Sequence, residues 1–335
     1  MKRIVWIDYA KSLAIYMVCL IHLHCDYTLT QLTKGIAMPL FFMISGFLFS
    51  SQRWQSFRPF LSRRFRQLII PYLWINAVTY IFWLVVGRNF GDDASACTQW
   101  HEPLKGILLG IGPLLIHNIP LWSLVSFFMV EIIYYLTLKV IPRPLPLIPV
   151  FLLTAWLSTL FPDVTGTLPL TLGAVGIGLF FYSVGHWARG IQLRASSSPA
   201  IRLSTMLLSL ALFVICTVSN VQVSFFRCQV GSFPLFIVGA LSGCLGFALL
   251  SAIIGRWLGE RKLIMLISYG TLLICGFHLL VFSLMKGVGV YLLGLSPEAM
   301  TKGILAGPLF ALVGLFLCLP IVLIVRRYFR PLVDK

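Results

Sequence analysis

The sequence contains ten apolar segments, each close to the length of about 20 residues that a helix needs to cross a bilayer. Because 59% of the 335 residues are hydrophobic and only 11% are charged, a soluble domain is excluded. We expect an all-α integral membrane protein, a bundle of about ten transmembrane helices, that forms one domain over residues 1–335 with no separate soluble domain. The predicted spans are 8–25, 33–50, 67–87, 121–141, 144–161, 168–187, 203–220, 233–254, 263–284 and 303–326.

Two apolar segments are ambiguous. Residues 104–119 are short and rich in Gly and Pro, so they are interpreted as re-entrant or interfacial. If they did cross the membrane, the chain would have eleven spans. The first segment includes Asp8 and Lys11 and lacks a small-residue cleavage site, so we expect it to remain as a helix rather than to be removed as a signal peptide.

The Lys and Arg residues predict the orientation. If both termini face the cytoplasm, 20 of the 26 basic residues lie on the cytoplasmic side, as the positive-inside rule requires. The other six are Lys34, Arg88, Lys105, Arg227, Lys286 and Lys302. This location between spans also explains the net charge of +16 without nucleic acid, which is not expected as a partner. We predict a multi-pass protein of a bacterial-type inner membrane.

Lys11 and His22 are the first candidate site residues. They are eleven positions apart, which places them within about 20° of each other on one helical face. Ionisable groups inside a membrane helix usually face a partner or a wet cavity, so the pair predicts a functional site. Two alternatives stay open, in which Lys11 extends to the headgroups and His22 is interfacial. Asp8, three residues before Lys11, is interpreted as its neutralising partner.

Two charged groups follow. Arg63, Arg64 and Arg66 precede the third span and suit an anion such as phosphate, although anchoring to lipid headgroups also explains them. Glu131 is the only acidic residue placed deep in a span. A lone carboxylate there needs a basic partner, for which His22, Lys11 and the arginines are candidates.

The remaining candidates have ordinary structural explanations beside the functional ones. Ser45 and Gly46 favour close helix packing, Trp122 suits an interfacial anchor, and His278 suits a hydrogen bond between helices. Tyr269 belongs to a Ser-Tyr-Gly stretch at residues 268–270. The eight cysteines have no zinc or haem spacing, so no metal is expected.

Taken in order, these motifs closely resemble the acyltransferase-3 family of integral membrane acyltransferases from residue 6 to the C-terminus. The motifs are Lys11 with His22, Phe41-Phe42 with Ser45-Gly46-Phe47, Arg63-Arg64-Phe65-Arg66 before Pro71-Tyr72, Leu121-Trp122 before Glu131, and Ser268-Tyr269 before His278. Many members have arginine where this chain has Lys11. The chain resembles the stand-alone type, similar to bacterial polysaccharide O-acetyltransferases.

The resemblance implies transfer of acetyl from acetyl-CoA to a hydroxyl of a cell-envelope carbohydrate, either a polysaccharide or a lipid-linked glycan. It suggests His22 as the base, Lys11 as a group that holds the donor or the thioester oxyanion, and Glu131 as an orienting or charge-balancing group. Arg63, Arg64 and Arg66 would bind the donor, with Ser45, Gly46, Trp122, Tyr269 and His278 in support.

Three alternatives stay open from the sequence. A transporter or flippase also has many helices and a charged interior. A second alternative is transfer of succinyl or a longer acyl group, and a third is a binding role in an envelope polysaccharide complex.

Overall fold

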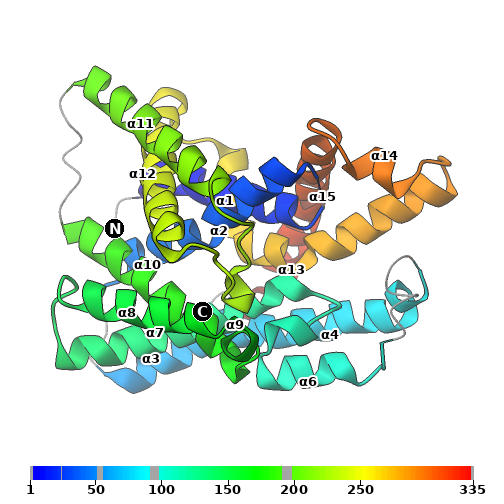
Figure 1. Ribbon diagram of the computed structural model, residues 1–335. Coiled ribbons are helices and arrows are strands. Elements are labelled where there is room, and N and C mark those ends of the chain that lie inside the picture. The colour runs from blue at the N-terminus through cyan, green and yellow to red at the C-terminus, as the bar shows by residue number, and fades with distance from the viewer. Residues whose placement is uncertain (1–2, 24, 51–55, 91–97, 191–197, 333–335) are drawn as a thin grey trace.

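The computed structural model describes residues 3–23, 25–50, 56–90, 98–190 and 198–332. These residues form helices and connecting loops, with one isolated bridge between Ser224 and Gln229 and no named strand among them. Figure 1 shows the helices gathered into one bundle. The main helices are α1 (Val5–Ile21), α2 (Tyr27–Leu48), α3 (Phe57–Arg64), α4 (Ile70–Val85), α6 (Glu102–Leu109), α7 (Trp122–Val140), α8 (Leu147–Leu160), α10 (Leu172–Gly190), α11 (Pro199–Val218), α12 (Phe233–Leu258), α13 (Lys262–Tyr291) and α15 (Ala306–Tyr328).

The remaining elements are short connecting helices. They are the π-helical turn η2 (Phe65–Ile69), the helices α9 (Pro162–Thr165) and α14 (Pro297–Thr301), and the 3-10 turns η3 (Gly87–Asn89), η4 (Gly112–Leu114), η5 (Ile119–Leu121), η6 (Pro169–Thr171), η7 (Phe225–Arg227) and η8 (Arg330–Leu332).

Each of the ten predicted spans overlaps one of these helices, although most of the helices begin or end several residues beyond the predicted bounds. In the described part of the chain, eight helical stretches are long and apolar enough to cross a membrane, and the other two spans correspond to the shorter helices α1 and α8. The all-α membrane class is therefore confirmed. The predicted bounds of the first span, 8–25, were wrong at both ends, because α1 begins at Val5 and ends at Ile21, with His22 at its C-cap.

Residues 104–119 do not form an eleventh span. Helix α6 has eight residues and ends at its C-cap Gly110, whose left-handed backbone (φ +62°) terminates the helix. The segment then packs back against the bundle, where the Asn118 amide donates to the Gly276 carbonyl of α13 at 2.7 Å. The prediction that this stretch does not span the membrane is confirmed.

Hydrogen bonds between helix ends show which ends share a side. The Tyr9 hydroxyl donates to the Gly259 carbonyl at 2.9 Å, and Arg189 donates to the Phe49 carbonyl. We call this side, where α1 begins, the basic end. At the other side, Gln31 donates to the Thr217 carbonyl at 2.8 Å. We call that side the opposite end.

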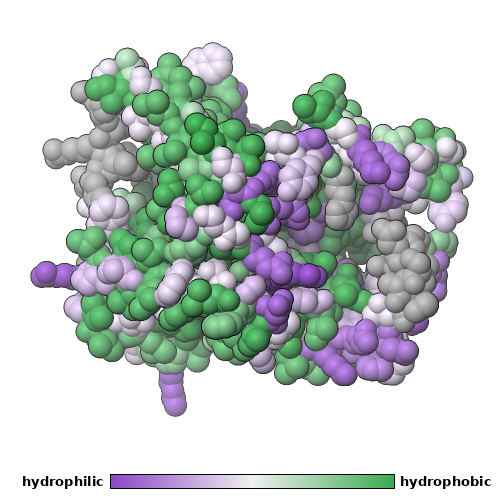
Figure 2. Space-filling view, viewed as in Figure 1, coloured by the Kyte–Doolittle hydropathy of each residue, from purple (hydrophilic) through white to green (hydrophobic). Residues whose placement is uncertain are grey.

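Small residues bring α2 and α10 into close contact. A Cβ atom added at Gly46 would lie 2.0 Å from the Tyr182 carbonyl oxygen, and one added at Gly185 would lie 2.1 Å from that of Met43. The predicted packing role of Gly46 is thus confirmed. Much of the visible outer face is apolar, as expected for helices against lipid (Figure 2). Ser45, the residue before Gly46, lines the interior cavity described below.

Candidate functional site

A cavity of about 320 Å³ lies among α1, α2, α7 and α13. Its wall on α1 extends from Lys11 to His22, eleven residues that rise about 16 Å along the helix axis. The cavity therefore extends from the basic end toward the opposite end. Its polar and charged lining is Lys11, His22, Lys34, Ser45, Arg64, Gln67, Ser123, Glu131, Ser224, Thr271 and Cys275.

His22 lies at the end of α1 beside a second histidine from α13. Its Nδ1 lies 2.7 Å from the Val18 carbonyl and 3.2 Å from Nε2 of His278, while Nδ1 of His278 lies 2.9 Å from the Ile274 carbonyl. Because carbonyl oxygens only accept hydrogen bonds, both Nδ1 atoms carry hydrogen, and the one Nδ1–H of His22 is shared between the Val18 carbonyl and Nε2 of His278. Nε2 of His22 is therefore the basic nitrogen of its neutral ring. The predicted helix-to-helix hydrogen bond of His278 is confirmed.

Lys11 shares the cavity with His22, as their spacing predicts, and is half-buried. Asp8 is not in ion-pair contact with Lys11, which corrects the predicted pairing, although its negative charge lies near enough to stabilise the ammonium. The Asp8 carboxylate pairs with Arg3 at 2.7 Å and accepts from Ser268 at 2.6 Å. In the described residues, no carboxylate forms an ion pair with Lys11. The ammonium thus adds positive charge to the cavity.

Glu131 pairs with Arg64, whose Nε lies 2.6 Å from its Oε2. Both side chains line the cavity, and Glu131 is buried. From the sequence, His22, Lys11 and the arginine cluster were candidate partners of Glu131. The partner in the structure is Arg64, one member of that cluster. Arg64 also donates to Gln67 at 3.0 Å. This ion pair therefore places two charges that balance each other in the cavity wall near the basic end.

The other two arginines lie elsewhere. Arg63 and Arg66 are exposed and do not line the cavity. The reason is geometric, because residues three apart share a helix face whereas Arg64 is turned about 100° from Arg63. Helix α3 also gives way to the π-helical turn Phe65–Ile69 at this point. The predicted clamp of three arginines is therefore divided between the cavity and the surface of the basic end.

Tyr269 is also outside the cavity. It is 51% exposed and lies between two guanidinium groups, with Arg3 at 4.8 Å and Arg326 at 5.1 Å from its ring centroid. These cation–π contacts connect α13 with the N-terminal segment and with α15. The position of Tyr269 therefore fits structural support at the basic end and places it away from the cavity.

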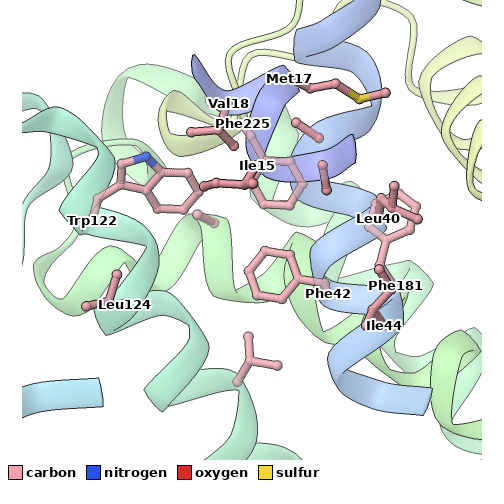
Figure 3. Packing of buried hydrophobic residues seen from close by; sticks show 14 of the residues in the cluster. Ile15, Met17, Val18, Leu40, Phe42, Ile44, Trp122, Leu124, Phe181 and Phe225 are labelled. Carbon is pink, nitrogen blue, oxygen red and sulfur yellow. The ribbon is translucent and has the colours of Figure 1, made fainter. Parts of the chain in front are cut away.

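An aromatic wall forms the side of the cavity near the opposite end. Trp122 lies 6.0 Å from both Phe225 and Phe226, measured between ring centroids, and all three residues line the cavity. Figure 3 shows Trp122 extending from α7 toward Phe225 and Ile15. Trp122 is 5% exposed, so it is not the interfacial anchor that the sequence also allowed.

Sequence reasoning missed a buried polar network behind this wall. Nε2 of His117 lies 2.9 Å from the Asn76 amide oxygen, and Asn118 donates to Thr79 at 3.2 Å. Their side chains support the loop that leads into α7 and Trp122. The signal available in the sequence was an adjacent His-Asn pair within the short apolar segment. Lys34 was counted only as a loop cation, yet it lines the cavity.

Comparison with known proteins identifies the family. The family model described as an acyltransferase domain, that of acyltransferase-3, matches residues 4–327, nearly the whole chain. No curated protein and no solved structure matched. The chain therefore belongs to the acyltransferase-3 family, and it is a multi-pass membrane protein of the acyltransferase type.

Proposed function

We propose that the protein transfers an acyl group, acetyl from acetyl-CoA, to a hydroxyl of a cell-envelope carbohydrate. The observation that carries this proposal is one cavity that contains the His22 imidazole near one end and the Lys11 ammonium near the other. The membership in an acyltransferase family favours the enzyme over the transporter and scaffold alternatives.

The separation of the groups supports the choice of donor. Lys11 and Arg64 lie near the basic end, and His22 lies about 16 Å further along α1. Coenzyme A has anionic phosphates joined to its thioester by a long pantetheine arm, which suits such a separation. In this arrangement Lys11 is too far from His22 to bind the same reacting oxyanion. Its proposed role is therefore to hold the donor, and the alternative of an oxyanion role is dropped.

The chemistry requires a base for a weakly acidic sugar hydroxyl. Nε2 of His22 accepts the hydroxyl proton while the sugar oxygen attacks the thioester carbonyl carbon. The carbon–sulfur bond then breaks, and the departing thiolate takes the proton from the His22 imidazolium. The products are the acetyl ester and free coenzyme A. The Val18 carbonyl and His278, which both accept from Nδ1–H, hold the His22 ring in the required tautomer.

The orientation remains part of the proposal. With the basic end in the cytoplasm, Arg63 and Arg66 would face the compartment that contains acetyl-CoA, and the acceptor would enter from the opposite end. The expected location is a bacterial-type inner membrane with both termini cytoplasmic, as the excess of basic residues on that side predicts.

The test is replacement of His22 by alanine. Removal of a general base lowers the rate by about 10²–10⁴-fold. Surface glycans from cells that express wild type or His22→Ala would be compared by mass spectrometry for acetyl increments, with equal amounts of folded protein verified by size-exclusion chromatography. His101→Ala, at an exposed histidine of the α6 N-cap, is the matched control. Near-normal acetylation by His22→Ala would refute the catalytic role.

A further inference from the structure

Lys34 is a cation near the opposite end that the proposed chemistry does not use. It lies about two turns from the start of α2, is half-buried and lines the same cavity as His22. Its ammonium donates to the neutral Gln222 side chain at 3.0 Å. Within the described ranges, no carboxylate forms an ion pair with Lys34. A partly desolvated ammonium with only an amide partner is electrostatically incomplete.

A second cation lies close by. Arg227 is near enough to Lys34 for the two positive charges to repel, and its guanidinium lies 5.5 Å from the Phe226 ring centroid. Like charges close to one another raise the local positive potential, which attracts an anionic ligand. Lys34 and Arg227 differ in this respect from Arg64, whose positive charge is balanced by the Glu131 carboxylate.

The surrounding wall fits a sugar. Trp122, Phe225 and Phe226 line the same part of the cavity. Phe225 is itself stacked against Phe42 and Trp122, so the partly exposed Phe226 and the cavity side of Trp122 are the surfaces on which the C–H groups of a pyranose ring would pack. A ring held there would have its hydroxyls toward the cavity, which His22 also lines.

We propose that the acceptor is an acidic glycan, whose carboxylate or phosphate is bound by Lys34 while its sugar ring packs on the aromatic wall of Trp122, Phe225 and Phe226. This inference rests on the proposed acyltransferase function and names the chemical class of the acceptor. Lys34 acts here as a binding residue that determines specificity. Arg227 strengthens the attraction as a second cation near Lys34.

The experiment measures binding, so that its outcome does not depend on turnover. Purified full-length protein in nanodiscs would be titrated with p-nitrophenyl glucoside, p-nitrophenyl glucuronide and p-nitrophenyl glucoside 6-phosphate, which share the ring and differ in charge. We expect wild type to bind at least one anionic probe roughly tenfold more tightly than the neutral probe. A roughly tenfold difference in Kd is the effect expected from the binding free energy of one charge-assisted hydrogen bond. A preference for the glucuronide or for the phosphate distinguishes the two sources of charge.

Lys34→Gln should remove this preference and leave binding of the neutral probe unchanged, whereas Lys34→Arg should retain it. Lys105→Gln is the matched control, because it removes the same charge from an exposed site on α6. Equal affinity of wild type for all three probes, or a preference that survives Lys34→Gln, would overturn the inference. The proposed function fails separately, if His22→Ala still transfers acetyl whichever probe binds.

Discussion

Positive charge is compensated differently at the two ends of the cavity. Near the basic end, Arg64 is matched by Glu131 at 2.6 Å, so the protein itself completes that site. Near the opposite end, Lys34 has only the Gln222 amide, and the aromatic wall lies beside it. The contrast indicates that Arg64 serves the structure of the cavity wall, whereas the charge of Lys34 is available to a ligand. His22, which lines the same cavity, is the proposed centre of the chemistry between donor and acceptor.

The largest expected effect comes from breaking the matched pair. Glu131→Gln leaves Arg64 partly buried without its counter-charge, and loss of one partner from a buried pair costs about 3–5 kcal/mol of unfolding free energy. Denaturant unfolding of the purified protein measures the loss. The double variant Arg64→Gln with Glu131→Gln should recover much of it, because no lone charge then remains. A loss in the double variant equal to the sum of the single losses would show that the pair is not coupled.

A smaller effect is expected at His278. His278→Ala removes one of the two acceptors for the Nδ1–H of His22 and leaves the Val18 carbonyl, which loosens the ring orientation. One such hydrogen bond contributes about 1 kcal/mol, so kcat should fall roughly fivefold while the KM for acetyl-CoA stays nearly constant. His278→Gln, with an amide oxygen as acceptor, should restore part of the rate. A change in KM alone would contradict the positioning role.

The smallest effect is expected at the exposed arginines. Replacing Arg63 and Arg66 with Gln removes two cations from the surface of the basic end, each worth about 0–1 kcal/mol in a screened interaction. The KM for acetyl-CoA should rise a few-fold, with unfolding free energy nearly unchanged. Raising the salt concentration should abolish the difference from wild type. An effect that persists at high salt would place these residues in direct contact with the donor.

The site was only partly predictable from sequence. The spacing of Lys11 and His22 correctly placed both on one cavity wall, because two residues on one helix have a fixed angular relation. The same geometry separates Arg64 from Arg63 and Arg66, so helical periodicity within the sequence already indicates that the three arginines do not share one face. The partner of Glu131 was narrowed to three candidates and no further, since the rotation of α7 relative to α3 is set by packing.

The sequence by itself determined the helical class, the location of the spans and the separation of basic from less basic loops. These properties are local, because the hydropathy and charge of each segment decide whether that segment enters the lipid or stays in water. Only the tertiary structure decided that His278 supports His22 from 256 positions away, and that Lys34 faces the cavity. Such relations depend on how helices rotate and approach one another. Close contacts such as Gly46 against the Tyr182 carbonyl set that arrangement, and no periodicity within one helix encodes it.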